Sequence, residues 1–136
     1  MASNRRWGCL MIFLALHFLA QLNGCHCANI KVTVFRGFGL RPDLFSPADG
    51  FVRVYYNNKD YGRTQIIQDS NNPAWNQNFF INNVSSGKKL ELKVYDNDLM
   101  FHDLLGTCTS NPRVSSSTIG CSLNEGGTVM YSYSVS

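Results

Sequence analysis

Apolar and polar residues alternate along most of the chain that follows residue 28. The segments 30–34, 90–94 and 129–135 each place an apolar residue at every second position. This period of two is typical of β-strands that bury one face. Five more short segments, rich in aromatic and β-branched residues, are also predicted to be strands: FVRVYY (51–56), RTQII (63–67), WNQNFFI (75–81), LLGTCT (104–109) and TIGCSL (118–123).

Turn-forming residues separate these segments. Gly, Pro, Asn and Asp gather in RPDLFSPADG, NNKDYG, DSNNP, NNVSSGKK and NEGG, and such clusters mark turns and loops. Sustained helical periodicity and internal repeats are absent from the sequence. About eight short strands at regular spacing predict an all-β protein, an eight-stranded antiparallel β-sandwich that forms a single domain.

The N-terminus has a different pattern. Arg5 and Arg6 precede CLMIFLALHFLA, an apolar run, and small and polar residues follow it. This order is typical of a secretory signal peptide. We expect a signal peptide over residues 1–27, with cleavage between 24 and 28, and the sandwich over residues 28–136. The alternative is an uncleaved anchor, but a membrane span needs about 20 apolar residues.

The charge balance excludes one class of partner. The chain has 12 Lys and Arg against 9 Asp and Glu. Removal of residues 1–27 takes away two arginines and no acidic residue, which leaves ten basic residues against nine acidic ones and a net charge of +1. A nucleic-acid-binding domain is usually strongly basic, so no nucleic-acid partner is expected.

Secretion would allow the cysteines to form disulfides and one asparagine to be glycosylated. Disulfides persist outside the cell, and a Cys108–Cys121 pair would close a short loop and stabilise the fold by about 3 kcal/mol. Cys25 and Cys27 stand at the cleavage region, and trimming, mutual pairing and pairing with another chain all remain open. Asn83 begins the sequon Asn-Val-Ser, which predicts N-glycosylation in a secreted protein.

The order of the strands predicts which loops meet. Successive antiparallel strands place alternate connections at opposite ends of a sandwich, so the loops 39–50, 68–74 and 96–103 are expected at one end. Five of the nine acidic residues lie in two of these loops. They are Asp43, Asp49, Asp96, Asp98 and Asp103.

Five carboxylates in one place require a counter-charge. Two carboxylates about 4 Å apart repel by roughly 4 kcal/mol at an effective dielectric of 20, and the nearby sequence offers only Arg41. Calcium takes six to eight oxygen ligands in flexible geometry, so the pattern predicts a calcium site. An EF-hand is excluded because its sixth loop position would be Phe101 rather than Gly. A glycosidase pair needs only two carboxylates, and solvated turn aspartates remain the plain alternative.

At these residues the sequence resembles the C2 domain family, the calcium-dependent phospholipid-binding sandwiches. The similarity spans VTVFRGFGL, RPDLFSPADGFVRV, YGRTQIIQDSNNPAWNQNF and LELKVYDNDLMFHDLLG. The DLLGTC stretch, the later SLNEG and the final YSYS are similar to the C2 domain at the C-terminal end of perforin, and so is the spacing of seven residues from Asp96 to Asp103. The topology is therefore expected to be perforin-like, with the first strand leading directly into the first calcium loop.

The resemblance implies roles for particular residues. The five aspartates would be calcium ligands, with the backbone carbonyl groups of Pro42 and Asn97 as additions. Because the predicted signal peptide directly precedes the C2 domain, the pore-forming domain of perforin is not expected and pore formation does not carry over. Calcium-gated docking on a phospholipid membrane does carry over, and host defence is the setting that the perforin likeness suggests.

Apolar residues stand between and beside the aspartates. They are predicted to form a membrane-binding tip on two loops, and partial insertion of such side chains would contribute roughly 5–8 kcal/mol. The alternative is that they pack back into the sandwich. The residues are Leu44, Phe45, Leu99, Met100 and Phe101.

The sequence therefore predicts a secreted, extracellular protein that is peripheral on membranes when calcium is bound. Its partners are expected to be calcium ions and a phospholipid surface. The alternative function is a calcium-stabilised extracellular module that binds another protein and no lipid. We do not expect an enzyme, because His26 and His102 are the only histidines after residue 24 and neither stands in a catalytic or zinc motif.

Overall fold

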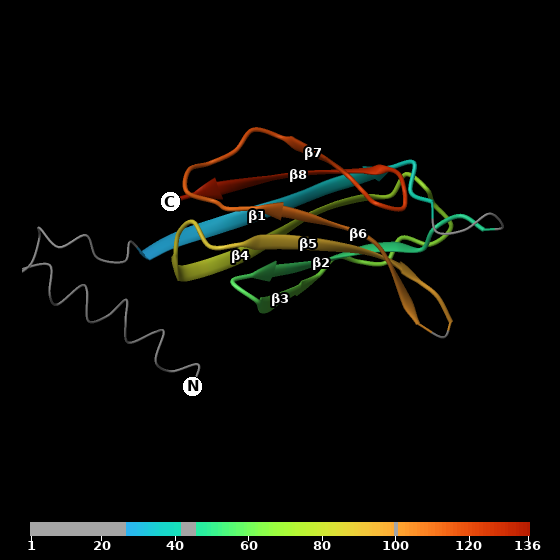
Figure 1. The fold of residues 1–136 in the computed structure, drawn as a ribbon, viewed down its shortest axis with the longest axis horizontal. Coiled ribbons are helices and arrows are strands. Elements are labelled where there is room, and N and C mark those ends of the chain that lie inside the picture. The colour runs from blue at the N-terminus through green and yellow to red at the C-terminus, as the bar shows by residue number, and fades with distance from the viewer. Residues whose placement is uncertain (1–26, 42–45, 100) are drawn as a thin grey trace, which may run out of the picture.

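The computed structural model describes residues 27–41, 46–99 and 101–136. These residues form eight strands in two layers (Figure 1). The strands are β1 (Cys27–Phe38), β2 (Gly50–Tyr56), β3 (Lys59–Arg63), β4 (Ala74–Ser85), β5 (Leu90–Asn97), β6 (His102–Ser110), β7 (Ile119–Ser122) and β8 (Thr128–Val135).

The strands form two four-stranded sheets, ordered β4-β1-β8-β7 and β3-β2-β5-β6. Every neighbouring pair is antiparallel. The predicted eight-stranded antiparallel β-sandwich is confirmed. β1 leads directly into the 39–49 loop, as the resemblance implies.

The core lies between the two sheets and follows the alternation seen in the sequence. Ile30, Val32 and Val34 of β1 face Val52 and Val54 of β2 across one buried cluster. Most of their outward neighbours, such as Lys31, Thr33 and Arg53, are exposed or half-buried, so each strand turns its apolar side chains inward. Phe51 of β2 is the exception, because it is buried although it lies outside the core cluster. Burial of this alternating set is what fixes the register of each strand.

The third strand lies earlier in the chain than RTQII predicts. β3 spans Lys59–Arg63, directly after a two-residue turn in which Asn57 and Asn58 have φ angles of 49° and 65°. Asparagine tolerates this left-handed conformation, and two such residues in succession join strands tightly. The sequence prediction of a strand over 63–67 was therefore wrong, because NNKDYG includes a hairpin turn and the start of a strand.

A disulfide joins Cys108 of β6 to Cys121 of β7, which confirms the predicted pair. It links the two sheets along one side of the sandwich, since β6 and β7 are the edge strands of different sheets. Cys27 is disulfide-bonded as well. In the described part of the chain, no helix is long and apolar enough to cross a membrane.

Candidate functional site: the aspartate end of the sandwich

Three loops meet at one end of the sandwich, as the strand count predicts. The Leu40 N–H donates a hydrogen bond of 2.8 Å to the Asn71 carbonyl, and the Ala48 N–H donates one of 2.9 Å to the Asn71 side chain. The Asn97 N–H donates to the Asp49 carbonyl at 2.9 Å. The loops after β1, β3 and β5 are therefore held together by backbone and amide groups.

Two aspartates form the inner part of this end. Asp49 directly precedes β2, and Asp96 is its neighbour across the β2–β5 pair, where Gly50 and Asp96 are in register. The Asp49 N–H donates a hydrogen bond of 2.7 Å to Oδ1 of Asp96, and the Asp69 N–H donates one of 2.7 Å to Oδ1 of Asp49. One oxygen of each carboxylate thus orients a neighbouring loop.

Asp96 is the one acidic side chain that is buried within the described residues, with 8% of its surface exposed. Burial raises its pKa above the ordinary value, while the hydrogen bond from the Asp49 N–H acts in the opposite direction. The negative charges of Asp49, Asp98 and Asp103 raise the pKa further. Three neighbouring carboxylates therefore act on Asp96, and none of the four forms a salt bridge within the described residues.

Asp98 and Asp103 lie on the β5–β6 hairpin. Asp103 is directly opposite Asp96 in the register of the two strands. The Asp98 N–H donates a hydrogen bond of 3.1 Å to the Phe101 carbonyl, and Oδ1 of Asp98 accepts one of 2.7 Å from the Leu99 N–H. Both side chains are exposed, so this part of the hairpin presents its carboxylates to solvent.

Several predicted site residues lie outside the described residues. These are Pro42, Asp43, Leu44 and Phe45 of the first loop and Met100 of the hairpin. Among the residues that are described, no three carboxylate, imidazole or thiol groups form a cluster that could hold a metal ion.

The donor chemistry of the described aspartates nevertheless suits calcium. Carboxylate and carbonyl oxygens are the ligands that this hard cation takes. Within the described residues, Asp49, Asp96 and Asp98 each use Oδ1 as a hydrogen-bond acceptor, and their Oδ2 atoms have no hydrogen-bond partner. Burial and, to a smaller extent, the charges of the neighbouring carboxylates raise the pKa of Asp96, and a bound cation would balance those charges.

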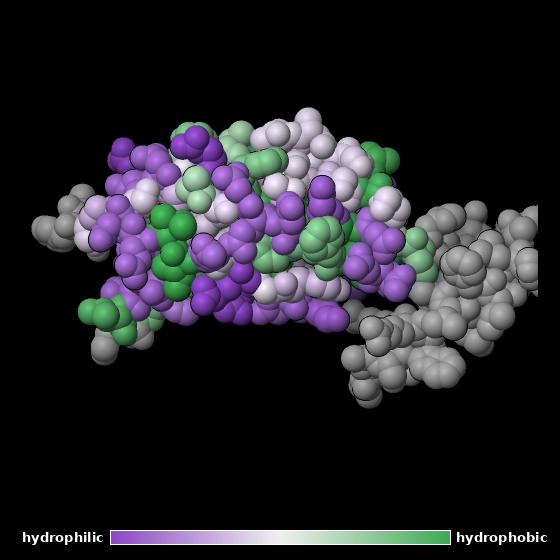
Figure 2. All heavy atoms as spheres, turned by 180° about the vertical axis from the view of Figure 1, so that it is seen from behind, coloured by the Kyte–Doolittle hydropathy of each residue, from purple (hydrophilic) through white to green (hydrophobic). Residues whose placement is uncertain are grey.

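Apolar side chains stand at the tip of the same hairpin. Leu99 is fully exposed, and Phe101 has 66% of its surface exposed. Figure 2 shows this hydrophobic tip standing out from a mostly polar surface at its lower left. Neither side chain packs back into the sandwich, which was the alternative reading of the sequence.

Sequence reasoning missed two contributions to this end. Asn71, in the loop after β3, holds the loop after β1 in place through both its backbone and its side chain, and only its position in DSNNPA pointed to it. Leu104 has 48% of its surface exposed, although LLGTCT reads as an ordinary buried strand. Asn83, the predicted glycosylation site, is exposed near the end of β4, at the opposite end of the sandwich.

Comparisons with known proteins give one family. The C2 domain model matches residues 28–124. Human perforin-1 is 34% identical over 102 residues, which cover 73% of this chain and 18% of perforin-1. A solved structure described as a C2 domain is 33% identical, has a TM-score of 0.76, and covers 82% of this chain and 99% of its own length.

A more distant structure shares the fold. It is described as extended synaptotagmin 2, C2A and C2B domains, calcium bound, with 15% identity and a TM-score of 0.70 over 79% of this chain and 45% of that one. The match to perforin-1 covers less than a fifth of that protein. The similarity therefore concerns one domain of a much longer relative.

Proposed function

The chain belongs to the C2 domain family, and on that premise we propose that it is a secreted module that docks on phospholipid membranes when calcium is bound. The observation that carries this proposal is the structure of the β5–β6 hairpin. The hairpin places the carboxylates of Asp98 and Asp103 beside the exposed side chains of Leu99 and Phe101. Binding rather than catalysis is the proposed role.

The calcium ligands in this proposal are Asp49, Asp96, Asp98 and Asp103, together with Asp43 and the carbonyl groups of Pro42 and Asn97. The described hydrogen bonds support it, because they bring Asp49 and Asp96 together and join Asn97 to the same loop. Bound calcium would supply positive charge that balances the carboxylates and can bridge to lipid phosphates. Sites of this kind in extracellular modules have dissociation constants of about 10⁻⁴–10⁻³ M.

The apolar tip explains why calcium would control docking. Burial of a Leu or Phe side chain contributes about 1.5–3 kcal/mol when complete, and the tip also includes Leu44, Phe45 and Met100 in this proposal. Uncompensated carboxylates next to the tip oppose entry into lipid, because charge inside a bilayer costs several kcal/mol. When calcium balances the negative charge of the carboxylates, this cost falls, and the same apolar side chains can anchor the domain in the membrane.

Vesicle sedimentation tests this proposal. Vesicles of phosphatidylcholine and phosphatidylserine are mixed with the protein in millimolar calcium and, in parallel, in excess chelator. The expected result is pelleting in calcium and none in chelator. Equal pelleting in both conditions, or none in either, overturns it. A calcium-dependent rise in melting temperature without pelleting would favour the protein-binding alternative.

Secretion is part of the same proposal. The Arg5 and Arg6 segment with its apolar run is proposed to be a signal peptide over residues 1–27, and the Cys108–Cys121 disulfide is consistent with an oxidising compartment. Expression in cultured mammalian cells should release the protein into the medium. N-terminal sequencing should then find a first residue between 25 and 29, whereas retention in the cell with an intact N-terminus would contradict this part.

A further inference from the structure

The edge strands of the two sheets are not equally protected. β6 and β7 lie on one side of the sandwich, where the Cys108–Cys121 disulfide joins them. β3 and β4 lie on the other side, where the Gln65 N–H that follows β3 donates a hydrogen bond of 2.5 Å to the Gln77 side chain of β4. An exposed edge presents N–H and C=O groups that can pair with another chain, and natural proteins prevent this with charge, proline or bulges. The β3 and β4 edges therefore need such protection.

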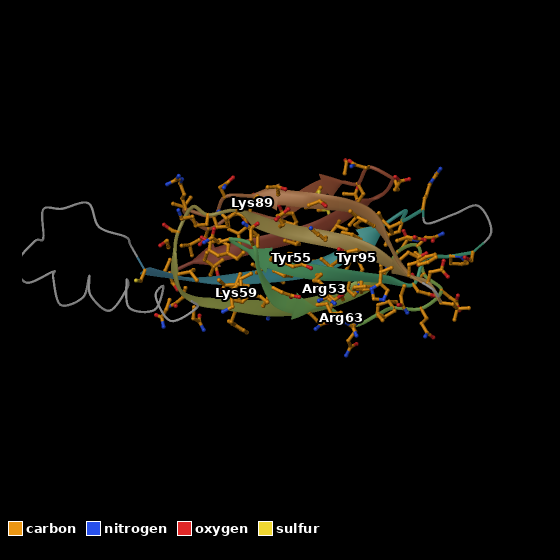
Figure 3. All side chains as sticks on the ribbon, turned by 60° about the horizontal axis from the view of Figure 1, so that its bottom comes forward. Arg53, Tyr55, Lys59, Arg63, Lys89 and Tyr95 are labelled. Carbon is orange, nitrogen blue, oxygen red and sulfur yellow. A yellow bond between two sulfur atoms is a disulfide. The ribbon has the colours of Figure 1, made fainter. Side chains whose placement is uncertain are left out.

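β3 carries protective charge and β4 does not. Lys59, Asp60 and Arg63 of β3 are all exposed, and Figure 3 shows Lys59 and Arg63 on the surface of their sheet. β4 has 12 residues, AWNQNFFINNVS, without a charged residue or a proline. Its Phe80 has 62% of its surface exposed. β4 is thus a long edge strand with no charge that would oppose pairing.

Two residues of β4 direct their backbone groups toward the free edge. Asn29 of β1 exchanges hydrogen bonds of 2.8 and 2.9 Å with the residue that follows β8. Because successive peptide groups of a strand point to opposite sides, Ile30 directs its own to β4, where it is in register with Ile81. Ile81 therefore directs its groups to β1, and Asn78 and Phe80, an odd number of positions earlier, direct theirs away. In the described part of the chain, these N–H and C=O groups of Asn78 and Phe80 have no hydrogen-bond partner.

Two bulges mark the ends of the straight part of this edge. Asn76 and Asn83 have φ angles of 49° and 55°, and each lies at a register shift between β1 and β4. Bulges bend the strand that contains them, so the segment 77–81 is the straight part, and Asn83, the proposed glycosylation site, lies beyond it. The two asparagines stand at nearly equal distances along the chain from Phe79. The segment is therefore nearly symmetric about Phe79, which favours pairing with its own copy.

We propose that the segment 77–81 pairs with the same segment of a second copy of this chain, antiparallel and about a two-fold axis at Phe79. Such an interface uses the same surface on both copies. Asn78 of each copy then lies opposite Phe80 of the other copy, and each of these pairs exchanges two backbone hydrogen bonds. The two Phe80 rings become diagonal neighbours on the outer face, a spacing that aromatic side chains can bridge. A second copy suits this edge because an uncharged strand meets itself without like-charge repulsion.

Antiparallel pairing would also separate the aspartate ends of the two copies. β4 begins at the aspartate end, directly after the loop that contains Asp69 and Asn71, and runs to the opposite end of the sandwich. Two antiparallel copies therefore carry their aspartate loops at opposite ends of the dimer. The pairing itself is independent of the proposed membrane docking. Where docking holds as well, one dimer contacts two membranes and draws vesicles together.

The mass of the protein in solution tests the pairing. The full chain secreted by mammalian cells is studied by sedimentation equilibrium at concentrations up to about 1 mM, because short strand segments pair weakly. The mass should rise with concentration toward that of a dimer. A mass that stays that of a monomer over the whole range overturns the proposal.

A charge placed on the edge should weaken the dimer. Phe80→Lys removes the aromatic contacts and brings two like charges together, which opposes strand pairing. Its matched control is Val114→Lys, which adds the same charge at a side chain with 75% of its surface exposed, in the segment between β6 and β7. Dimer association should fall at least about tenfold in Phe80→Lys relative to Val114→Lys. Equal association of the two variants overturns the proposal.

Backbone pairing gives two measurements that do not depend on Phe80→Lys. Asn78→Pro removes an N–H that faces the free edge, a position where a sheet tolerates proline. This variant should keep the melting temperature of the unchanged protein at low concentration and lose the dimer. In the unchanged protein, the Asn78 and Phe80 amides should exchange hydrogen more slowly as the concentration rises. Exchange at these two amides that is independent of concentration, in a protein that dimerises, overturns pairing through β4.

Vesicle clustering separates the dimer from the proposed function. In calcium, light scattering by phosphatidylcholine and phosphatidylserine vesicles should rise with Val114→Lys and stay low with Phe80→Lys, although both variants pellet with the vesicles. Equal clustering by the two variants overturns the antiparallel arrangement. A protein that dimerises and binds no vesicles overturns the proposed docking and leaves the β4 pairing intact.

Discussion

The backbone N–H of Asp49 donates a hydrogen bond of 2.7 Å to the carboxylate of Asp96. The two residues are on different loops, and this bond holds those loops together. An Asn side chain has an oxygen in the same place and can accept the same bond. Replacement of Asp96 by Asn should therefore remove the negative charge and keep the hydrogen bond that joins the two loops.

The Asp96→Asn and Asp98→Asn double variant should fold and lose the calcium response. The hydrogen bonds to Oδ1 of both residues are kept, while two negative charges are removed. Because the number of charged ligands sets the affinity of calcium sites, calorimetry should show calcium binding weakened at least about tenfold. Asp60→Asn is the control, since Asp60 lies on β3 and pairs with Arg53. Unchanged calcium affinity in the double variant would exclude this site.

Phe51→Ala should destabilise the domain although Phe51 lies outside the main core. The variant leaves a cavity among Tyr95, His102 and Arg63, and truncation of a buried Phe costs about 3–5 kcal/mol. Urea unfolding measures the change in the free energy of unfolding. Phe80→Ala, at an exposed position, should change it by less than about 0.5 kcal/mol. Similar small losses in both variants would mean that the contacts of Phe51 with Tyr95, His102 and Arg63 contribute no packing energy.

Replacement of Cys108 and Cys121 together by Ser should lower the free energy of unfolding by about 3 kcal/mol, because the unfolded chain regains the freedom of a closed loop. The separation of 13 residues sets this expectation. Calcium binding should persist wherever the double variant is folded, since the pair lies on β6 and β7 beyond the aspartate loops. A double variant with an unchanged free energy of unfolding would contradict the predicted contribution of the disulfide.

Asp60 should titrate below its ordinary range. A hydrogen bond from the Gly62 N–H lowers its pKa, and so does the Arg53 side chain. A carboxylate with a lowered pKa in the folded state contributes stability above its unfolded pKa and loses it as pH falls through the folded value. The stability difference between the unchanged protein and Asp60→Asn should therefore disappear in acid below that range. NMR titration of Asp60 measures the pKa directly, and an ordinary value would contradict the assigned contacts.

Asn83 should carry a glycan that does not affect vesicle binding. The residue is exposed and lies at the end opposite the aspartate loops. Protein secreted by mammalian cells should shift in mass after glycosidase treatment, and Asn83→Gln should abolish the shift while the neighbouring Asn82→Gln should not. A glycosylated form that fails to bind vesicles bound by the deglycosylated form would contradict docking through the aspartate loops.

The fold was predictable because most strands bury one face. Spacing alone predicts that one face of β1 is buried, the face that carries Ile30, Val32 and Val34. Lys59–Arg63 does not, because an edge strand that is mostly exposed carries no alternation, and its start depends on the φ angles of Asn57 and Asn58.

The site was only partly predictable for a similar reason. The sequence shows where the aspartates are, and the order of the strands predicts that the loops of Asp49 and Asp96 lie at the same end of the sandwich. The outward burial of Phe51 and the exposure of Leu104 depend on a bulge and on partners from three strands. Local sequence carries no signal of such contacts.

The most direct test of the central claim is the calcium affinity measured with and without lipid. If calcium and an anionic membrane bind the same end of the domain cooperatively, each must strengthen the binding of the other by the same factor. Calcium titrated into the protein should therefore bind at least about tenfold more tightly in the presence of phosphatidylserine vesicles, a coupling within the usual range. An identical calcium affinity with and without vesicles would contradict calcium-dependent membrane docking.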